Sequence, residues 1–404
     1  MTYLKTIDLS NNSFSAIESN YFKDLSFLTS IHLLNSRLNL IGFEAFSYLP
    51  KLNLIDFEGT SVEIIGSESF TSLDSYWNFN FSGLGIRDIH PNALSNIQYV
   101  SKLNLSHNDL TVIHKRTFRI GWIDELDLSF NKIHELESGT FDGLGQQYLG
   151  SLNLNGNNIS NLRFGSFSGI QGIELITFEE NLIHTIEPGT FHDIRMMQEQ
   201  NAISINYNKL ELIQGNTFSG IQNLQTLKIA YNKLEVIEPN AFYGLGTLVT
   251  LKLGNNNISL LNLQSFAGLD HLQNLILTNN SLASFRTGTF SHLPNLKYLD
   301  VSNNIFSKLN EIVFHPMRNL VRLNLEGNHL RSIDYKSLLG YQGLLSEINL
   351  GNNRWRCIEL THMLNTFRKR TIEYLSNLVG NFTTENVESI ACSDVNVSDL
   401  IVLD

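Results

Sequence analysis

The 404-residue chain has little of several features that would define other classes of protein. It contains 2 cysteines and 6 prolines, and no apolar run approaches the ~18–20 residues that span a bilayer. Two cysteines cannot build a disulfide-rich framework or a four-cysteine zinc site. Basic residues are also scarce, since 28 Lys and Arg stand against 39 Asp and Glu and the net charge is −11. This balance argues against nucleic acid and anionic membranes as partners, because both attract basic surfaces.

Motifs of common catalytic and cofactor sites are absent as well. The sequence has no Gly-x-Ser-x-Gly elbow, Walker loop, His-Glu-x-x-His or Cys-x-x-Cys. The segment 165–169 reads Gly-Ser-Phe-Ser-Gly, so a phenylalanine stands where a nucleophile would be needed. The 12 histidines are scattered, without acids at ligand spacing. We therefore expect no enzymatic activity, no catalytic residues, and no residues that bind a cofactor or a metal.

What the chain does contain is a repeat of 24 residues that runs through most of its length. The pattern is L-x-x-L-x-L-x-x-N-x-L-x-x-I-x-x-x-x-F-x-x-L, in about fifteen copies, and the copies that start at Leu224 and Leu248 are well formed. The L-x-x-L-x-L part predicts a short strand whose leucines point inward with a period of two. One copy cannot bury its own apolar face, so the copies are expected to stack around a shared core.

Two further positions of the repeat have distinct physical roles. The nineteenth position is usually Phe, which predicts a stacked aromatic spine. The ninth position is usually Asn, whose amide both donates and accepts hydrogen bonds where the chain leaves the strand. Ser36 and Thr60 replace this Asn and can still form a hydrogen bond, but Leu84 cannot. The fourth repeat is therefore expected to be locally irregular.

This pattern resembles the leucine-rich repeat family in its 24-residue extracellular form, over roughly residues 4–355. The resemblance implies a mainly β solenoid of the α/β type, a horseshoe of about fifteen repeats with a parallel sheet of about fifteen strands on its concave side. It divides the chain into a solenoid over 1–355, without an N-terminal cap, and a C-terminal cap over 356–404. Two copies exceed 24 residues, and their extra residues are expected in loops before the next strand.

The two ends of the chain differ. In 358–367, apolar residues that include Ile358 and Leu360 have helical spacing, which predicts a cap helix. The family's cap often holds four cysteines, and here Cys357 and Cys392 match it, so the resemblance implies one disulfide between them; two reduced, buried cysteines are the alternative. The first repeat starts at Leu4 with an apolar edge and no cap, which indicates a fragment of a longer sequence.

Eight asparagines occupy N-x-S/T sequons, about as many as the composition predicts, so they permit secretion without indicating it. They are Asn11, Asn80, Asn104, Asn158, Asn257, Asn279, Asn381 and Asn396. Asn80 and Asn104 fall on the concave strand face, where a glycan would block part of the surface.

A partner is expected on the concave face. The outward strand positions carry more acids than bases, which favours a protein ligand or partner subunit over a polyanion. Outward aromatic residues flanked by charges mark the middle repeats. The predicted contact residues are Phe130, Glu179, Glu180, Tyr207, Lys228, Tyr231 and Lys252. An ordinary solvated face is the alternative.

The resemblance also bears on function. Gly-Thr-Phe segments such as 139–141 are similar to those of Toll-type receptor ectodomains, and the two-cysteine cap is similar to that of secreted insect immune proteins. This implies an extracellular, non-enzymatic protein-recognition scaffold, in innate immune recognition or receptor signalling. A cell-adhesion or extracellular-matrix protein built from the same repeats is one alternative. An intracellular scaffold is another, which reduced cysteines and unused sequons would favour.

Overall fold

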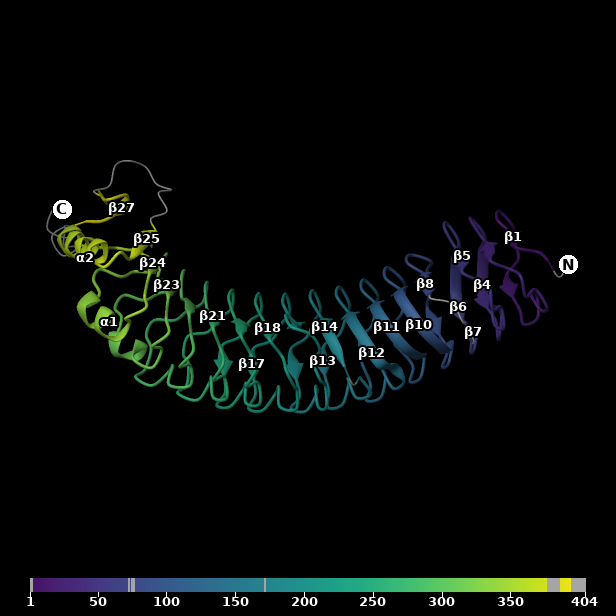
Figure 1. Cartoon of the computed structure of the whole chain (residues 1–404), viewed down its shortest axis with the longest axis horizontal. Coiled ribbons are helices and arrows are strands. Elements are labelled where there is room, and N and C mark those ends of the chain that lie inside the picture. The colour runs from purple at the N-terminus through teal and green to yellow at the C-terminus, as the bar shows by residue number, and fades with distance from the viewer. Residues whose placement is uncertain (1–2, 72, 74–76, 171, 376–385, 394–404) are drawn as a thin grey trace, which may run out of the picture. The chain divides into compact units, whose positions relative to one another are not determined.

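The computed structural model describes residues 3–71, 73, 77–170, 172–375 and 386–393. The chain separates into two units, which we describe in turn. Unit 1 contains the residues up to 210 together with 216–226, and unit 2 contains 211–215 and the residues from 227 onward. Figure 1 shows the chain coloured from purple at the N-terminus to yellow at the C-terminus.

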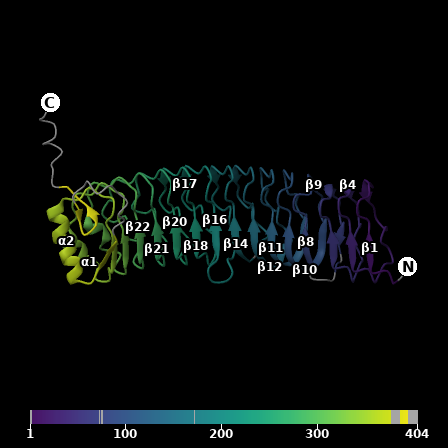
Figure 2. The same ribbon diagram turned by 90° about the horizontal axis from the view of Figure 1, so that it is seen from above.

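Unit 1 consists of short parallel strands, one from each successive repeat. A first sheet contains β1 (Thr6–Asp8), β3 (Ser30–His32) and β5 (Leu54–Asp56). A second contains β7 (Phe70–Thr71), β8 (Trp77–Asn80), β10 (Leu94–Asn104), β11 (Phe118–Asp127), β12 (Leu144–Asn153), β14 (Ile173–Thr177) and β16 (Ala202–Ser204). Smaller ladders are formed by β2 (Ala16–Ile17), β4 (Arg37–Ile41), β6 (Ser61–Ile65) and β9 (Asp88–Ile89), and by β13 (Asn161–Leu162) with β15 (Thr185–Ile186). Figure 2 shows β4 and β9 along one long side and β8, β10 and β11 along the other.

Unit 2 continues the same construction and adds three helices. Its strands are β17 (Leu212–Ile213), β19 (Val236–Ile237), β20 (Thr250–Lys252), β21 (Asn274–Ile276), β22 (Tyr298–Asp300), β23 (Arg322–Asn324), β24 (Glu347–Asn349) and β25 (Glu373–Leu375). The helices are η1 (Glu311–Phe314), α1 (Tyr335–Tyr341) and α2 (Cys357–Lys369), and the antiparallel pair β26 (Asn386–Val387) and β27 (Ile390–Ala391) follows. β18 (Thr226–Lys228) lies at the division between the units. The register steps by 24 residues, as in Leu251↔Leu275↔Leu299.

The core confirms the inward positions and the spine predicted from the repeat. Leu251, Leu275 and Leu299 are fully buried. In unit 1 the rings of Phe141, Phe167, Phe191 and Phe218 stack with centroids 5.4 to 6.0 Å apart. In unit 2 the spine continues through Phe242, Phe266 and Phe290. Each repeat therefore shares its apolar surface with the next one, as a solenoid requires.

The asparagines at the ninth position form a buried hydrogen-bond ladder, as the sequence predicts. Asn157 is typical: its Nδ2 donates to the carbonyl oxygens of Leu128 and Leu154, each at 3.0 Å, and its Oδ1 accepts from the N–H of Ile133. One side chain thus satisfies backbone groups of its own repeat and of the preceding one. The same pattern recurs at Asn108 and Asn131 in unit 1, and at Asn280 and Asn304 in unit 2.

The structure corrects the expectation of one uninterrupted sheet. Among the described residues, β5 pairs with β3 but not with β8, so the sheet is interrupted between the third and fourth repeats. This interruption falls at the repeat with Leu84 in place of Asn, where irregularity was expected. The two extra residues of the copy that opens at Ile123 were expected in a loop, and they lie instead within the span of the long strand β12, where 145–147 stand opposite one residue of β11. The extra residues of the other long copy precede β16, as expected.

The C-terminal segment contains the predicted helix. In α2 the side chains of Leu360, Met363 and Phe367 are buried, but Ile358, expected on the same face, is 65% exposed. Cys357 at its start is joined to Cys392 by a disulfide, and Cys392 also pairs with the buried Trp355 in a β-bridge. Helix α2 and the disulfide jointly cover the end of the last repeat. The division of the chain at 355/356 stays a prediction.

Candidate protein-interaction surface

The turn that follows a strand of the sheet contains a residue with left-handed backbone geometry, at the eighth position of the repeat. Asn255, Asn279 and Asn303 illustrate this turn in unit 2, with φ of 52–57°. Asn and Gly adopt this geometry most readily, and other residues pay roughly 1–2 kcal/mol for it. Phe130 and Tyr207 nevertheless occupy it, with φ of 52° and 55°. Strained backbone that carries an exposed aromatic side chain is a reasonable mark of a functional position.

In unit 1, Phe130 and Tyr207 each expose 48% of their surface. The ring of Phe130 stacks on that of His107 with centroids 4.7 Å apart. The Glu179 carboxylate accepts hydrogen bonds from the hydroxyl of Ser204 and from Nδ2 of Asn206, which fix its position, and Glu180 is exposed. Glu179, Glu180 and Tyr207 thus lie in the turns of two successive repeats, after β14 and β16, whereas Phe130 follows β11, from which β12 separates them.

The other three predicted contact residues, Lys228, Tyr231 and Lys252, belong to unit 2. Tyr231 has the same left-handed turn, with φ of 55°. Tyr231 and Lys252 are exposed, and Lys228 is half-buried. Since the seven predicted residues divide between two units, their role as one contact surface stays a prediction.

Several acids at the outward strand positions accept hydrogen bonds that close the turn after the strand. Oδ1 of Asp127 accepts hydrogen bonds from the N–H and the hydroxyl of Ser129, at 3.0 and 2.6 Å. Hydrogen bonds donated by Ser10 likewise lower the pKa of Asp8 from its ordinary value. Asp300, which is 9% exposed, accepts in the same way from the N–H and the hydroxyl of Ser302. These carboxylates therefore stabilise the turns after the strands in addition to carrying negative charge.

A row of aromatic residues that sequence reasoning missed crosses β10, β11 and β12. Tyr99, Trp122 and Tyr148, here called the aromatic row, lie in register on these strands. The rings of Trp122 and Tyr148 stack with centroids 4.4 Å apart, and Tyr99 is exposed. Each precedes the first inward residue of its repeat, a position for which the repeat pattern specifies no residue type. An aromatic residue at this position in three successive copies was the available signal.

Carboxylates hold the aromatic row in place. Nε1 of Trp122 donates to Asp124 at 2.9 Å, and the Tyr148 hydroxyl donates to Glu174. Burial, together with this hydrogen bond and the negative charge of Glu174, raises the pKa of Tyr148 to about 12. The row therefore presents neutral aromatic side chains beside anionic ones.

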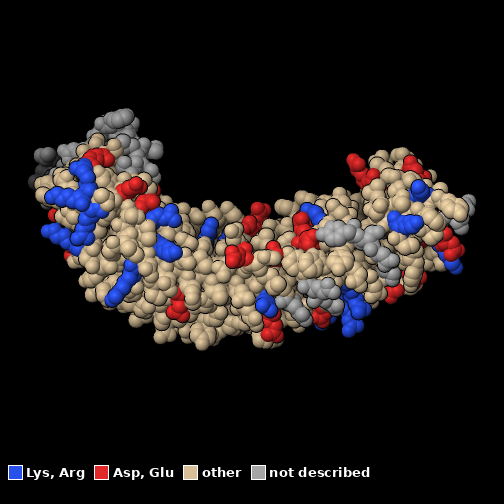
Figure 3. Space-filling view, viewed as in Figure 1, with Lys and Arg blue, Asp and Glu red and all other residues tan. Residues whose placement is uncertain are grey.

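Charges of both signs occur near the aromatic row, with acids in excess. Lys102 on β10 pairs with Glu125 on β11, with 2.8 Å between Nζ and Oε1. The face of the molecule in Figure 3 shows acidic and basic side chains interspersed among uncharged ones. The local excess of carboxylates favours a partner surface with basic side chains.

The sequon asparagines occupy several environments. Five of them are exposed: Asn11, Asn80, Asn158, Asn257 and Asn279. Asn104 is half-buried, and its Oδ1 accepts from the N–H and hydroxyl of Ser106. Asn381 and Asn396 lie outside the described residues. Asn80 and Asn104 end β8 and β10, and glycosylation at all eight positions stays a prediction.

In the described part of the chain, no group of three or more His, Cys, Asp or Glu side chains is placed to hold a metal ion. Over the same residues, no helix has the length and apolarity needed to cross a membrane.

Comparison with protein families agrees with this geometry. Residues 147–199, 201–258, 222–282 and 270–330 match the leucine rich repeat pattern. Residues 15–146 match a BspA-type leucine rich repeat region, and 3–25 match a further leucine rich repeat. The chain belongs to the leucine-rich repeat family.

Similar curated proteins carry the same kind of repeat over part of their length. Tsukushi of Xenopus tropicalis is 28% identical over 136 residues, which are 34% of this chain and 37% of that protein. The human leucine-rich repeats and immunoglobulin-like domains protein 1 is 29% identical over 131 residues, 32% of this chain and 11% of that protein. The chain thus matches only about a third of Tsukushi and a smaller share of the human protein.

Solved structures share the fold of this chain. A chain of the Drosophila Toll–Spatzle complex aligns with a TM-score of 0.63 and 18% identity, over 92% of this chain and 47% of that one. An internalin from Listeria monocytogenes aligns with a TM-score of 0.51 and 20% identity, over 89% of both chains. These likenesses show the fold of this chain, a leucine-rich repeat solenoid that resembles Toll.

Proposed function

We propose that this protein is a non-enzymatic, extracellular recognition scaffold that binds a protein partner through the sheet side of unit 1. The observation that carries the proposal is the aromatic row on β10, β11 and β12. Tyr and Trp are enriched among the residues that dominate binding energy at protein interfaces. Here they are held by stacking and by hydrogen bonds to Asp124 and Glu174, so little side-chain freedom is lost on binding.

The chemistry around the aromatic row indicates the kind of partner. Asp124, Glu125 and Glu174 lie beside it, and Lys102 is already paired with Glu125. A partner with Arg or Lys side chains would gain ion pairs with the carboxylates and cation–π contacts with the rings. Phe130 and Tyr207 add exposed aromatic side chains in the turns that follow β11 and β16.

An extracellular location and a recognition role fit the other observations. The Cys357–Cys392 disulfide is typical of an oxidising compartment. The Toll–Spatzle complex, to which this chain is similar in fold, is described as a hub in Drosophila development and innate immunity. We propose innate immune recognition or receptor signalling as the process served.

The proposal is tested by screening the full chain against an array of extracellular proteins and repeating each hit with two triple variants. One variant carries Tyr99→Ala, Trp122→Ala and Tyr148→Ala. The matched control carries alanine at three exposed aromatic residues of unit 1 outside the aromatic row: Tyr21, Phe43 and Phe164. Losing three such anchors should weaken the affinity for a genuine partner by at least about 100-fold, and the affinity of the control variant should stay within about twofold of that of the unmodified chain. Partners that tolerate both variants equally, or an array with no binder, would contradict the proposal.

A further inference from the structure

At the interruption between β5 and β8, the described structure lacks backbone hydrogen bonds that are present at the neighbouring junctions of unit 1. Between the second and third repeats, the N–H groups of Leu33 and Asn35 donate to the carbonyls of Asp56 and Glu58, each at 2.9 Å. Between the fourth and fifth repeats, Phe81 donates to Asn104 at 2.8 Å. Each repeat thus normally donates two hydrogen bonds forward to the next one.

Between the third and fourth repeats the two equivalent bonds are missing from the described structure. Phe57 and Gly59 would be the donors, and the carbonyls of Asn80 and Ser82 the acceptors. Phe57 and Gly59 both line a cavity, so a strand supplied from elsewhere could accept hydrogen bonds from their N–H groups.

Sequence features explain why the sheet opens at this junction. Leu84 occupies the ninth position, so no amide reaches back to the carbonyl of Phe57, as Asn108 reaches back to Phe81. Behind the strands, aromatic rings replace the smaller leucines of the repeat pattern. The ring centroids of Phe57 and Phe81 are 5.5 Å apart, and those of Trp77 and Phe79 are 4.9 Å apart. This greater volume keeps the two strands apart on the sheet side.

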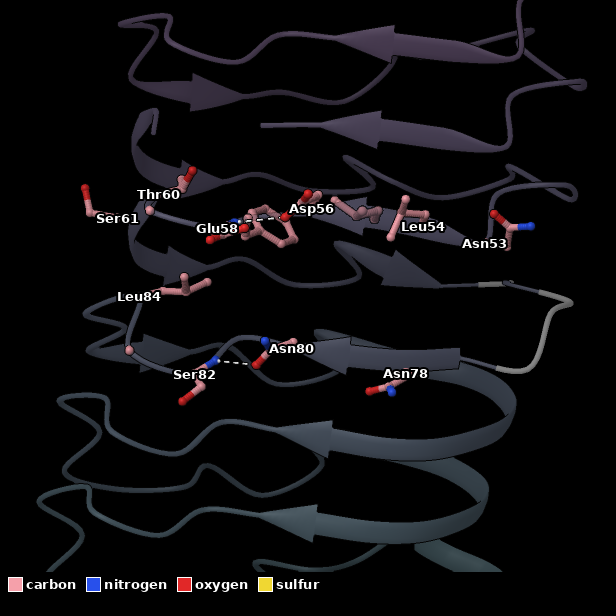
Figure 4. A pocket seen from close by; sticks show the side chains of 14 residues that line it. Asn53, Leu54, Asp56, Glu58, Thr60, Ser61, Asn78, Asn80, Ser82 and Leu84 are labelled. Atoms are coloured by element: carbon pink, nitrogen blue, oxygen red, sulfur yellow. Dashed lines mark hydrogen bonds between the residues drawn. The ribbon is translucent and has the colours of Figure 1, made fainter. Parts of the chain in front are cut away.

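The opening is a slot with a closed base. On the far side of these repeats β6 pairs with β9, and the N–H of Val62 donates to the carbonyl of Leu84 at 2.9 Å. On the sheet side a cavity of about 800 Å³ extends along both strands. Figure 4 shows Asp56 and Glu58 on one wall and Asn78, Asn80 and Ser82 on the other. The slot therefore has donors on one wall, acceptors on the other, and two carboxylates.

We propose that this slot binds an extended peptide segment of a partner, which enters as an added strand between β5 and β8. The peptide's carbonyls would accept from the N–H groups of Phe57 and Gly59, and its N–H groups would donate to Asn80 and Ser82. Since side chains of a strand alternate, one set would face the aromatic core and the other the solvent side. The carboxylates of Asp56 and Glu58 select a peptide with basic residues in the second set. This site shares no residue with the aromatic row, so it stands or falls separately from the proposed function.

The test uses the full disulfide-bonded chain, produced without glycans so that Asn80 carries none. The probe is an acetylated and amidated Lys-Val-Lys-Val-Lys-Val peptide, and its counterpart has Glu in place of Lys. We expect the Lys peptide to bind at least tenfold more tightly than the Glu peptide and to slow hydrogen exchange at the amides of Phe57 and Gly59. Failure of the Lys peptide to bind, or binding that leaves those two amides unchanged, would overturn the proposal.

Two sets of variants sharpen the test. Leu84→Asn supplies the missing amide, which should donate to the carbonyl of Phe57 and narrow the slot, and it should therefore weaken peptide binding at least tenfold. Leu84→Met is the matched control, which adds no amide and should bind as the unmodified chain does. The surface pair Asp56→Asn with Glu58→Gln should remove the preference for Lys over Glu, even where Leu84→Asn fails to fold. An unchanged preference in that pair, or protection of both amides in the free unmodified chain, would refute the slot.

Discussion

The hydrogen-bond ladder makes a sharp prediction at Asn157. This side chain is 3% exposed and serves the N–H of Ile133 and the carbonyls of Leu128 and Leu154. Asn157→Ala leaves the N–H of Ile133 without its partner in a place where water has little access, whereas the carbonyls of Leu128 and Leu154 still accept from Asn131 and Asn181. A buried polar group without a partner costs about 1–3 kcal/mol. Since one group is left unpaired and two carbonyls each lose one of their two donors, we expect a loss of roughly 1–3 kcal/mol.

The neighbouring Asn158 provides a matched control. It has the same side chain but is exposed, and in protein made without glycans its replacement by alanine should change stability by less than about 0.5 kcal/mol. Because repeat arrays can unfold in parts, native-state hydrogen exchange at Ile133 and Leu154 should accompany urea unfolding. Exchange at both amides should accelerate in Asn157→Ala and stay unchanged in Asn158→Ala. If the two variants unfold within about 0.5 kcal/mol of each other, the ladder does not stabilise the fold as argued.

Three further predictions concern other parts of the chain. Burial and neighbouring acids raise the pKa values of Tyr148 and Tyr298 to about 12, above the ordinary value of 10.0, so both should ionise later than exposed tyrosines. Their contribution to stability is complete below pH 10.0 and is lost as pH rises through about 12. Absorbance titration should show that Tyr148→Phe and Tyr298→Phe each remove one tyrosine that ionises late. If both variants keep the same number of late-ionising tyrosines as the unmodified chain, the prediction is wrong. Replacing Cys357 and Cys392 by Ser opens a loop with a sequence separation of 35 and should destabilise the C-terminal segment by about 3–4 kcal/mol, seen as faster proteolysis there; unchanged cleavage would show that the disulfide is dispensable. Phe167→Leu removes two ring contacts of the spine and should cost about 1–3 kcal/mol in urea unfolding, whereas a cost near zero would mean that ring stacking adds nothing beyond apolar volume.

Features that every repeat shares were predictable from the sequence, because the same physical requirement recurs at the same position. An inward leucine, a spine phenylalanine and a ladder asparagine each have nearly the same neighbours in every copy. The helix α2 followed from its apolar spacing, although Ile358 in its first turn lies in solvent. The disulfide rested on resemblance to the family's cap, since spacing alone fixes no pairing.

Features that depend on two neighbouring repeats together were harder to predict. The substitution at Leu84 predicted irregularity, but the resulting slot also depends on the volumes of Phe57, Phe79 and Phe81 behind it. The aromatic row depends on the register between three strands, and β12 keeps that register through a bulge where it has extra residues. A scan of one copy at a time does not detect such pairings.

The acids of the sheet face show why composition alone is a weak guide to a binding surface. Asp127 closes the turn at the end of β11, so its removal would disturb the strand end as well as the charge. Glu180 is exposed after the turn that follows β14. A partner attracted only by net charge should respond equally to Asp127→Asn and Glu180→Gln. A partner that contacts Phe130 should respond more strongly to Asp127→Asn, which removes the charge three residues before Phe130 and keeps the acceptor oxygen of the turn. Comparing the salt dependence of binding for the two variants separates long-range attraction from direct contact, because only the former is largely screened by salt.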